Sequence, residues 1–310
     1  MFVLIRVILL SQSIKPSIVY SAQTVRLEIL HEAPTHSQNE AMTSLKDETF
    51  MLYRQLDRHY VIKVYNRDNM EEVKEVIPLP GTGARHMTGC NVSNCVYICL
   101  RLGDSPSHEI LRISRDVENK FIISPWINDT KLAFAMSVTA NGSVVTLSTR
   151  REGASSDVVR IYNTDGSLER EVMLPLDLDA FLYTSVIQKS NGNLVLAYVG
   201  HHDLGLRLAE IEVSGSLVRQ FQASAEHSHE SCVNVADAND RIMICIPFEG
   251  VELLDSEFNL IGVYRLPHDQ SESLSQSDLH YDWNRNEIVR LHCDCDTMTN
   301  GLTIFRFTEE

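Results

Sequence analysis

The chain has 310 residues and carries 42 acidic against 27 basic side chains, a formal net charge of −15. This acidity argues against nucleic acid as the main partner, because phosphate binding needs a basic surface. Hydrophobic residues make up 44% of the sequence, which is ordinary for a globular chain and leaves enough apolar surface for a full core.

The N-terminus begins with an apolar run, Met1 to Leu10, which Arg6 interrupts. Small residues follow at Ser21 and Ala22, so residues 1–23 fit either a signal peptide or an N-terminal tail. The run is too short to cross a bilayer as a helix, and no transmembrane span is predicted. A cleaved signal would imply secretion, whereas a retained tail leaves the compartment open.

Thr24 to Leu30 (TVRLEIL) alternates apolar and charged residues, which is typical of a strand. It has no hairpin partner nearby, and the polar stretch from His31 to Asn39 is predicted to be a connector. The last unit of the chain, Asp278 to Glu310, shows three strands and lacks a fourth. We therefore expect the N-terminal strand to complete that unit, because closure removes an exposed sheet edge.

The clearest repeat unit ends in Val158 to Leu176 (VVRIYNTDGSLEREVMLPL). Alternating residues on either side of Asp165-Gly166 predict two strands and a tight turn, since Asp-Gly supplies the left-handed backbone that a hairpin needs. A turn at Asn141-Gly142 and further apolar strands precede it, so the unit is four short strands. Comparable units recur at steps of about 42 to 51 residues, a spacing typical of propeller blades.

The motif of this unit is NG, an apolar strand, and then I-Y-N-x-D-G-x-L, and it resembles the NHL-type family of TolB-like, six-bladed β-propellers. The resemblance covers roughly Glu40 to Phe307 and is clear in the third and fourth units. At Glu257-Phe258-Asn259 the DG turn is missing. The resemblance implies an all-β, six-bladed propeller with four-stranded antiparallel blades, formed by residues 24–310 as a single domain that we expect to be monomeric.

Seven cysteines are present, and none forms the paired CxxC frame of a zinc site. Cys95, Cys99 and Cys245 lie in apolar strand runs, where a free thiol behaves as a small hydrophobe. This use of cysteine favours a reducing compartment such as the cytoplasm. His227 and His229, close to Cys232, are the densest group of potential metal ligands, but spacing assigns no third ligand and a polar loop explains them as well.

Candidate binding residues come from the loops that should lead into the innermost strand of each blade, at the mouth of the central channel. They are Arg85, His86, Lys131, Asp179, His229 and Asp278. This set mixes both charges and does not reproduce the cage of Glu, Asn and Asp side chains with which sugar-lactone hydrolases of this shape hold a cation. No catalytic residue and no metal ligand is therefore assigned, and no GxSxG or HExxH motif is present.

Rigid strands that carry variable loops favour a recognition platform. The first hypothesis is therefore a non-enzymatic scaffold, without a cofactor, that binds a protein or peptide through its loops and channel mouth. The alternative is a metal-assisted hydrolase of the sugar-lactonase kind, with a divalent cation in the central channel. A second alternative is an extracellular receptor fragment, which requires the N-terminal segment to be a cleaved signal peptide.

Overall fold

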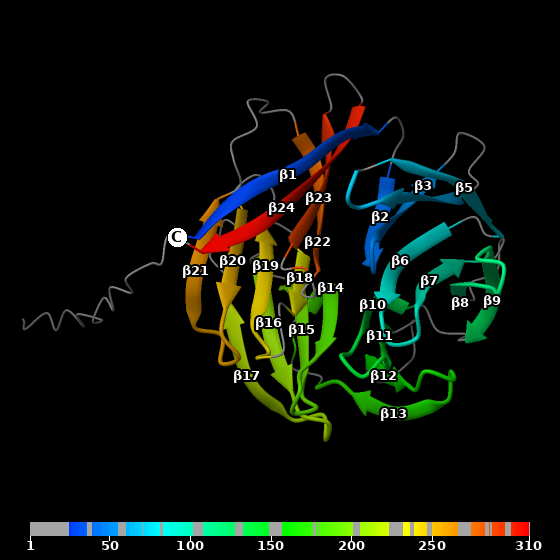
Figure 1. The fold of residues 1–310 in the computed structure, drawn as a ribbon. Coiled ribbons are helices and arrows are strands. Elements are labelled where there is room, and N and C mark those ends of the chain that lie inside the picture. The colour runs from blue at the N-terminus through cyan, green and yellow to red at the C-terminus, as the bar shows by residue number, and fades with distance from the viewer. Residues whose placement is uncertain are drawn as a thin grey trace, which may run out of the picture.

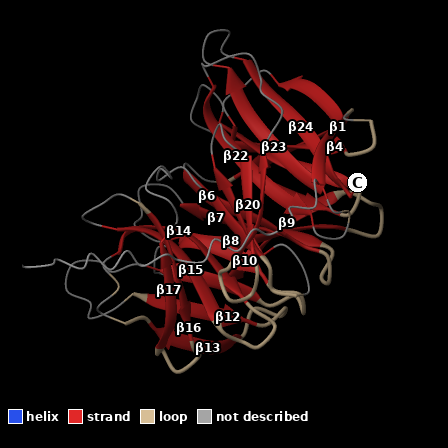
Figure 2. Ribbon diagram, turned by 90° about the vertical axis from the view of Figure 1, so that its left-hand side faces the viewer, coloured by secondary structure: helices blue, strands red, loops and turns tan. Residues whose placement is uncertain are grey.

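A computed structural model describes residues 25–35, 39–54, 60–69, 71–80, 83–101, 108–127, 133–148, 157–175, 178, 180–200, 205–222, 232–235, 239–246, 250–265, 274–282, 285, 287–294 and 299–309. The regular elements in these residues are all β-strands, and Figure 2 draws no helix. In this part of the chain, no helix is long and apolar enough to cross a membrane.

The strands form six four-stranded antiparallel sheets, five of them built from consecutive strands. The first two sheets are β2 (Asn39–Leu45), β3 (Glu48–Arg54), β4 (Tyr60–Asn66) and β5 (Glu72–Leu79), and then β6 (Gly83–Cys90), β7 (Cys95–Arg101), β8 (His108–Arg115) and β9 (Phe121–Ile127). The next two are β10 (Ala133–Val138), β11 (Val144–Ser148), β12 (Val158–Tyr162) and β13 (Leu168–Met173), and then β14 (Ala180–Gln188), β15 (Leu194–Gly200), β16 (Leu206–Ile211) and β17 (Leu217–Gln222). The fifth is β18 (Cys232–Val235), β19 (Ile242–Ile246), β20 (Gly250–Leu254) and β21 (Leu260–Arg265). The remaining sheet joins β22 (Leu274–Asp282), β23 (Glu287–Asp294) and β24 (Thr299–Glu309) to β1 (Val25–Thr35).

The sheets are arranged as the blades of a propeller (Figure 1). The first strands of the sheets, β2, β6, β10, β14, β18 and β22, contact one another in that order, and β22 contacts β2 in turn. These inner strands therefore form a closed ring, which leaves no sheet face uncovered between neighbours. The predicted all-β propeller with four-stranded antiparallel blades is confirmed.

The N-terminal strand closes the last sheet, as the sequence predicted. Strand β1 pairs with β24 from Val25 opposite Glu309 to Thr35 opposite Asn300, and Figure 1 shows the two strands side by side. The prediction of a connector over His31 to Asn39 was wrong, because β1 continues to Thr35. The long β24 offers backbone partners along that whole length, and polar side chains do not prevent pairing.

Among the described residues, five of the six sheets have a turn with one residue in the left-handed region. The predicted turns at Gly142 and Gly166 have φ angles of +91° and +87°. At Glu257-Phe258-Asn259 the same turn forms without glycine: Phe258 takes the left-handed position at φ +70°, and its N–H donates to the Asp255 carbonyl as that of Gly166 donates to Asn163. An aromatic residue in this region is unusual and strained.

The core lies between neighbouring sheets. Strands β11, β12 and β15 are buried at every residue, whereas the outer strands β13 and β17 are mostly exposed. Apolar side chains of the β2–β5 and β6–β9 sheets form one cluster, and those of the β10–β13 and β14–β17 sheets form another. Burial on both faces explains the unbroken apolar runs in the middle strands.

Candidate functional site

The ring of inner strands has two ends. We call the "turn end" the one where each inner strand turns into the second strand of its sheet, at residues Leu45, Cys90, Val138, Gln188, Val235 and Asp282. The "entry end" is the opposite one, where the inner strands begin, at Asn39, Gly83, Ala133, Ala180, Cys232 and Leu274. Because every sheet is built in the same way, inner strand first, the six strands enter the ring from one side.

The entry end is irregular in five of the six inner strands. The pairing register shifts between Asn39 and Ala41, Ala84 and His86, Ala133 and Ala135, Ala180 and Leu182, and Leu274 and Ser277. Only β18 pairs without a shift along its described length. Bulges re-aim side chains and are over-represented beside active sites. Their accumulation at one end of the channel marks that end as the candidate site.

Two of the predicted residues lie at such a bulge. Arg85 is the residue skipped by the register shift in β6, and the half-buried His86 follows it opposite Cys99. Asp278 lies in β22, opposite Leu291. All three were expected in loops before the inner strands, and this was wrong: β6 begins at Gly83 and β22 at Leu274, so the three residues lie within the inner strands. Lys131, Asp179 and His229 lie outside the described residues, as does His227.

Sequence reasoning missed Glu40, the residue skipped by the register shift in β2. Strand β2 lies between β6 and β22 in the ring and contacts both. Glu40 is five residues before the turn end of β2, Arg85 is five before that of β6, and Asp278 is four before that of β22. One residue of strand spans about 3.3 Å, so these three positions stand at a similar height on adjacent strands.

The residues at these neighbouring positions are two carboxylic acids, Glu40 and Asp278, one arginine, Arg85, and one histidine, His86. Carboxylate oxygens are the ligands that Mg²⁺ and Ca²⁺ prefer, so the chemistry of Glu40 and Asp278 suits a hard divalent cation. Among the side chains that the structure describes, no three His, Cys, Asp or Glu residues lie close enough to hold a metal. Those side chains do not include Glu40 and Asp278, which are placed by their backbone alone.

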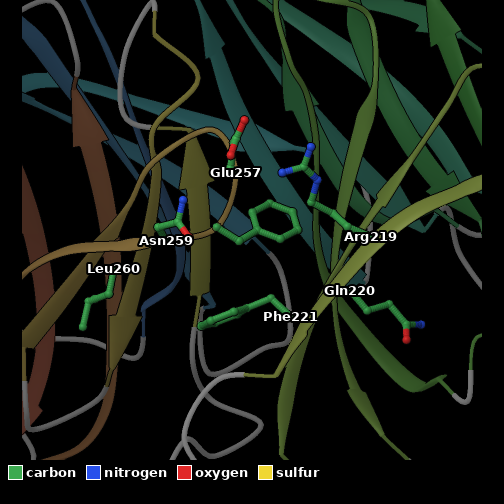
Figure 3. A pocket seen from close by; sticks show the side chains of 7 residues that line it. Arg219, Gln220, Phe221, Glu257, Asn259 and Leu260 are labelled. Carbon is green, nitrogen blue, oxygen red and sulfur yellow. The ribbon is translucent and has the colours of Figure 1, made fainter. Parts of the chain in front are cut away.

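A cavity of about 680 Å³ lies away from the channel, between β17 and the turn that joins β20 to β21. Phe221 and Phe258 both line it, and Figure 3 shows Arg219 and Glu257 above the Phe221 side chain. The two phenyl rings meet edge to face at 6.3 Å, and the Arg219 guanidinium lies 6.0 Å from the centre of the Phe258 ring. These contacts explain how the packing holds the strained Phe258 backbone.

Buried charges lie behind this cavity. Glu210 accepts hydrogen bonds from Lys189 Nζ at 3.1 Å and Asn193 Nδ2 at 2.7 Å, and Arg219 Nε lies 3.1 Å from its second oxygen. Burial raises the pKa of Glu210, but the hydrogen bonds from Asn193 and Lys189 and the nearby positive charges outweigh it, and the pKa lies below its ordinary value. Lys189 also donates to the Ser256 carbonyl at 2.8 Å, which ties the β14–β17 sheet to the β18–β21 sheet. The arrangement is that of a structural junction.

No protein-family model matches the chain, and no curated protein does. Solved structures do resemble it. A gluconolactonase from Xanthomonas campestris has a TM-score of 0.56 and 13% identity, covering 92% of this chain and 90% of its own. A luciferin-regenerating enzyme has a TM-score of 0.56 and 9% identity, covering 91% and 95%. Virginiamycin B lyase from Staphylococcus aureus has a TM-score of 0.53 and 12% identity, covering 90% and 99%.

Likeness at such low identity establishes the propeller fold. It does not extend to the NHL or TolB families, since no family model matches. The expectation of a non-enzymatic recognition scaffold needs correction. That expectation took binding as the default use of the fold, whereas the solved propellers that resemble this chain over nine tenths of its length include a lactonase and a lyase. The propeller fold therefore gives no ground for taking a binding role as the default.

Proposed function

We propose that the protein is a metal-assisted hydrolase that opens a lactone or related cyclic ester at the entry end of its central channel. The observation that supports this most directly is the backbone position of Glu40, Arg85, His86 and Asp278 on three neighbouring inner strands, two of which are bulged at Glu40 and Arg85. The shared fold with a gluconolactonase supports the choice of substrate class.

The chemistry follows from the residue types. A divalent cation, when bound, polarises a lactone carbonyl and lowers the pKa of a coordinated water. Glu40 and Asp278 would hold that cation through carboxylate oxygens. His86 supplies an imidazole, the side chain best suited to move a proton near neutral pH.

Arg85 supplies a fixed positive charge, which would stabilise the negative charge that develops on the carbonyl oxygen. Water adds to the carbonyl carbon and the ring C–O bond breaks. The product is a hydroxy acid, and its ionisation releases one proton for each ring opened. The reaction can therefore be followed with a pH indicator.

The experiment is an indicator assay on the purified full chain with a panel of five- and six-membered sugar lactones. It is run after chelation and again with Mg²⁺, Ca²⁺, Mn²⁺ or Zn²⁺ restored. We expect ring opening that depends on one of these cations. We expect it to fall at least 100-fold in Glu40→Gln and in Asp278→Asn, since second-sphere changes alone cost 10- to 100-fold.

The matched control is Glu169→Gln, which removes an exposed carboxylate from the outer strand β13, far from the inner ring. It should retain the wild-type rate. The proposal fails if no lactone is opened with any cation, or if Glu40→Gln and Asp278→Asn are as active as the control.

A further inference from the structure

Cys90 and Cys95 form a pair that the proposed function does not use. Cys90 ends β6 and Cys95 begins β7, and the two residues are directly opposite in the antiparallel register. Both side chains are fully buried and both thiols are free, and the Cys90 S–H donates to the Gly142 carbonyl at 3.8 Å. We propose that Cys90 and Cys95 are a redox-active dithiol, which hydrogen peroxide or an organic hydroperoxide converts to an intramolecular disulfide.

The backbone already holds the two residues near bonding distance. Residues directly opposite in an antiparallel pair have Cβ atoms about 4.5–5.5 Å apart. A disulfide needs Cβ atoms about 3.5–4.5 Å apart. The bond therefore requires at most a small local movement across one hairpin, and no rearrangement of the sheets.

The two thiols have different surroundings, which assigns their roles. The Ser93 backbone N–H donates to Cys90 Sγ at 3.3 Å. The neighbouring Cys95 thiol lowers the pKa of Cys90 below its ordinary value, burial opposes this effect, and the Ser93 N–H adds to it. The pKa of Cys95 is raised, first because its proton is shared with Cys90 and then because the site is buried. Cys90 is therefore the attacking thiolate and Cys95 the thiol that resolves it.

The chemistry balances with the peroxide as oxidant. The Cys90 thiolate attacks one peroxide oxygen, the O–O bond breaks, and with one proton the products are a sulfenic acid at Cys90 and water or an alcohol. Cys95 sulfur then attacks the Cys90 sulfur, the S–O bond breaks, and a second water leaves with the Cys95 proton. Two thiols are oxidised by two electrons, and one peroxide is reduced.

Peroxide would reach the two buried thiols through the short turn between β6 and β7. Buried thiols are ordinarily inert, so the pair needs a way for peroxide to reach it. Its surroundings include the four-residue turn at 91–94, in which Asn91 and Asn94 are exposed and Val92 is 61% exposed, and the Gly142 carbonyl of the next sheet. Turn residues at the surface open more easily than core strands. The proposal therefore requires the 91–94 turn to move and admit peroxide to Cys90.

Cys99 is the internal control, because it is equally buried in β7 but stands opposite His86. The folded full chain is treated with hydrogen peroxide, free thiols are alkylated in denaturant, and the chain is cut with trypsin and chymotrypsin. Cleavage after Arg85 and Tyr97 gives fragment 86–97, which contains Cys90 and Cys95 without Cys99.

We expect this fragment to carry no alkyl group and to have lost two hydrogens, reversibly with a thiol reductant, while Cys99 remains alkylated. In Cys95→Ser, Cys90 should give a sulfenic acid that dimedone traps, and in Cys90→Ser neither product should form. Cys99→Ser should react like the wild type. The proposal is overturned if fragment 86–97 stays fully alkylated, or if the disulfide forms only after the chain has been unfolded.

Discussion

The two ends of the inner ring are built differently. At the turn end, the described inner strands pair regularly with their neighbours up to the last residue, as at Leu45 opposite Glu48 and Gln188 opposite Leu194. At the entry end, five of the six inner strands carry a register shift. The comparison indicates that regular pairing stabilises the turn end, whereas the entry end has the irregular backbone that is over-represented beside active sites.

Ion pairs between the first and last sheets also lie near the turn end. Near the turn end, Arg67 and Glu287 form a buried ion pair at 2.9 Å across the ring closure, and Arg306 approaches the second Glu287 oxygen at 2.6 Å. Arg285 bridges to Asp47 and Asp68 on the same side. These pairs join the β22–β1 sheet to the β2–β5 sheet. Substitutions at the turn end should therefore cost stability, and those at the entry end should cost function.

The largest effect is expected for Glu287→Ala. This change removes the Glu287 carboxylate from beside the Arg67 guanidinium, whose side chain is 0% exposed, and breaking such a buried pair costs about 3–5 kcal/mol. Chemical denaturation measures the loss. The control is Glu118→Ala, which removes an ion pair with Lys120 that is about two-thirds exposed and should cost under about 1 kcal/mol. Equal losses in the two variants would show that the closure is not held at the turn end.

Gly89→Ala should come next. A Cβ at this position would lie 2.2 Å from the Ser44 backbone oxygen, because β6 and β2 approach closely there and the Gly89 N–H donates to Thr43 Oγ1 at 2.8 Å. Forcing the strands apart should cost about 1–3 kcal/mol. In the control, Gly262→Ala, the added Cβ meets the end of the Tyr264 side chain, which can move. A thermal melt should separate the two variants, and an unchanged melt for Gly89→Ala would contradict the close approach.

A smaller loss of folding stability is expected when the pH is lowered. The pKa of Glu210 is lowered in the folded state, so its contribution to stability is fully present above the ordinary value of 4.5 and is lost as the pH falls below 4.5 through the folded pKa. Denaturation curves at a series of pH values should therefore show a decline below pH 4.5 that is shallower in Glu210→Gln. A variant with the same slope as the wild type would exclude Glu210 as a source of the decline.

The smallest effect on stability is expected at the entry end. Glu40→Gln changes a residue at a register shift and Asp278→Asn one that follows a shift, and both introduce a neutral side chain of the same shape, so we expect changes within about 0.5 kcal/mol. The same variants should lose lactone hydrolysis. A stability loss as large as that of Glu287→Ala would show that the two ends of the ring do not divide their roles.

The fold could be predicted because short sequence patterns specify its hairpins. Alternation on either side of Asp165-Gly166 specifies a hairpin, and repetition of that hairpin specifies the ring. The N-terminal partner of β24 could be inferred because the last unit lacked one strand. The left-handed Phe258 could not, since its backbone is held by packing against Phe221 and by the Asp255 carboxylate.

The site was predictable only in part. Arg85 and Asp278 were candidates because the sequence placed them in loops leading into inner strands, but a bulge is a feature of register and leaves no mark in composition. Glu40 was missed because it borders a polar stretch that was taken as a connector. Cys90 lies opposite Cys95 because the turn between them has four residues. The sequence CNVSNC alone does not determine the length of that turn or the register of the two strands.

The most direct test of the account is anomalous diffraction from crystals of the full chain grown with Mn²⁺. The account predicts one strong manganese peak at the entry end of the channel, within coordination distance of both the Glu40 and Asp278 carboxylates, and its loss in Glu40→Gln. A channel without a peak, or a peak held by other residues and unchanged in Glu40→Gln, would contradict it.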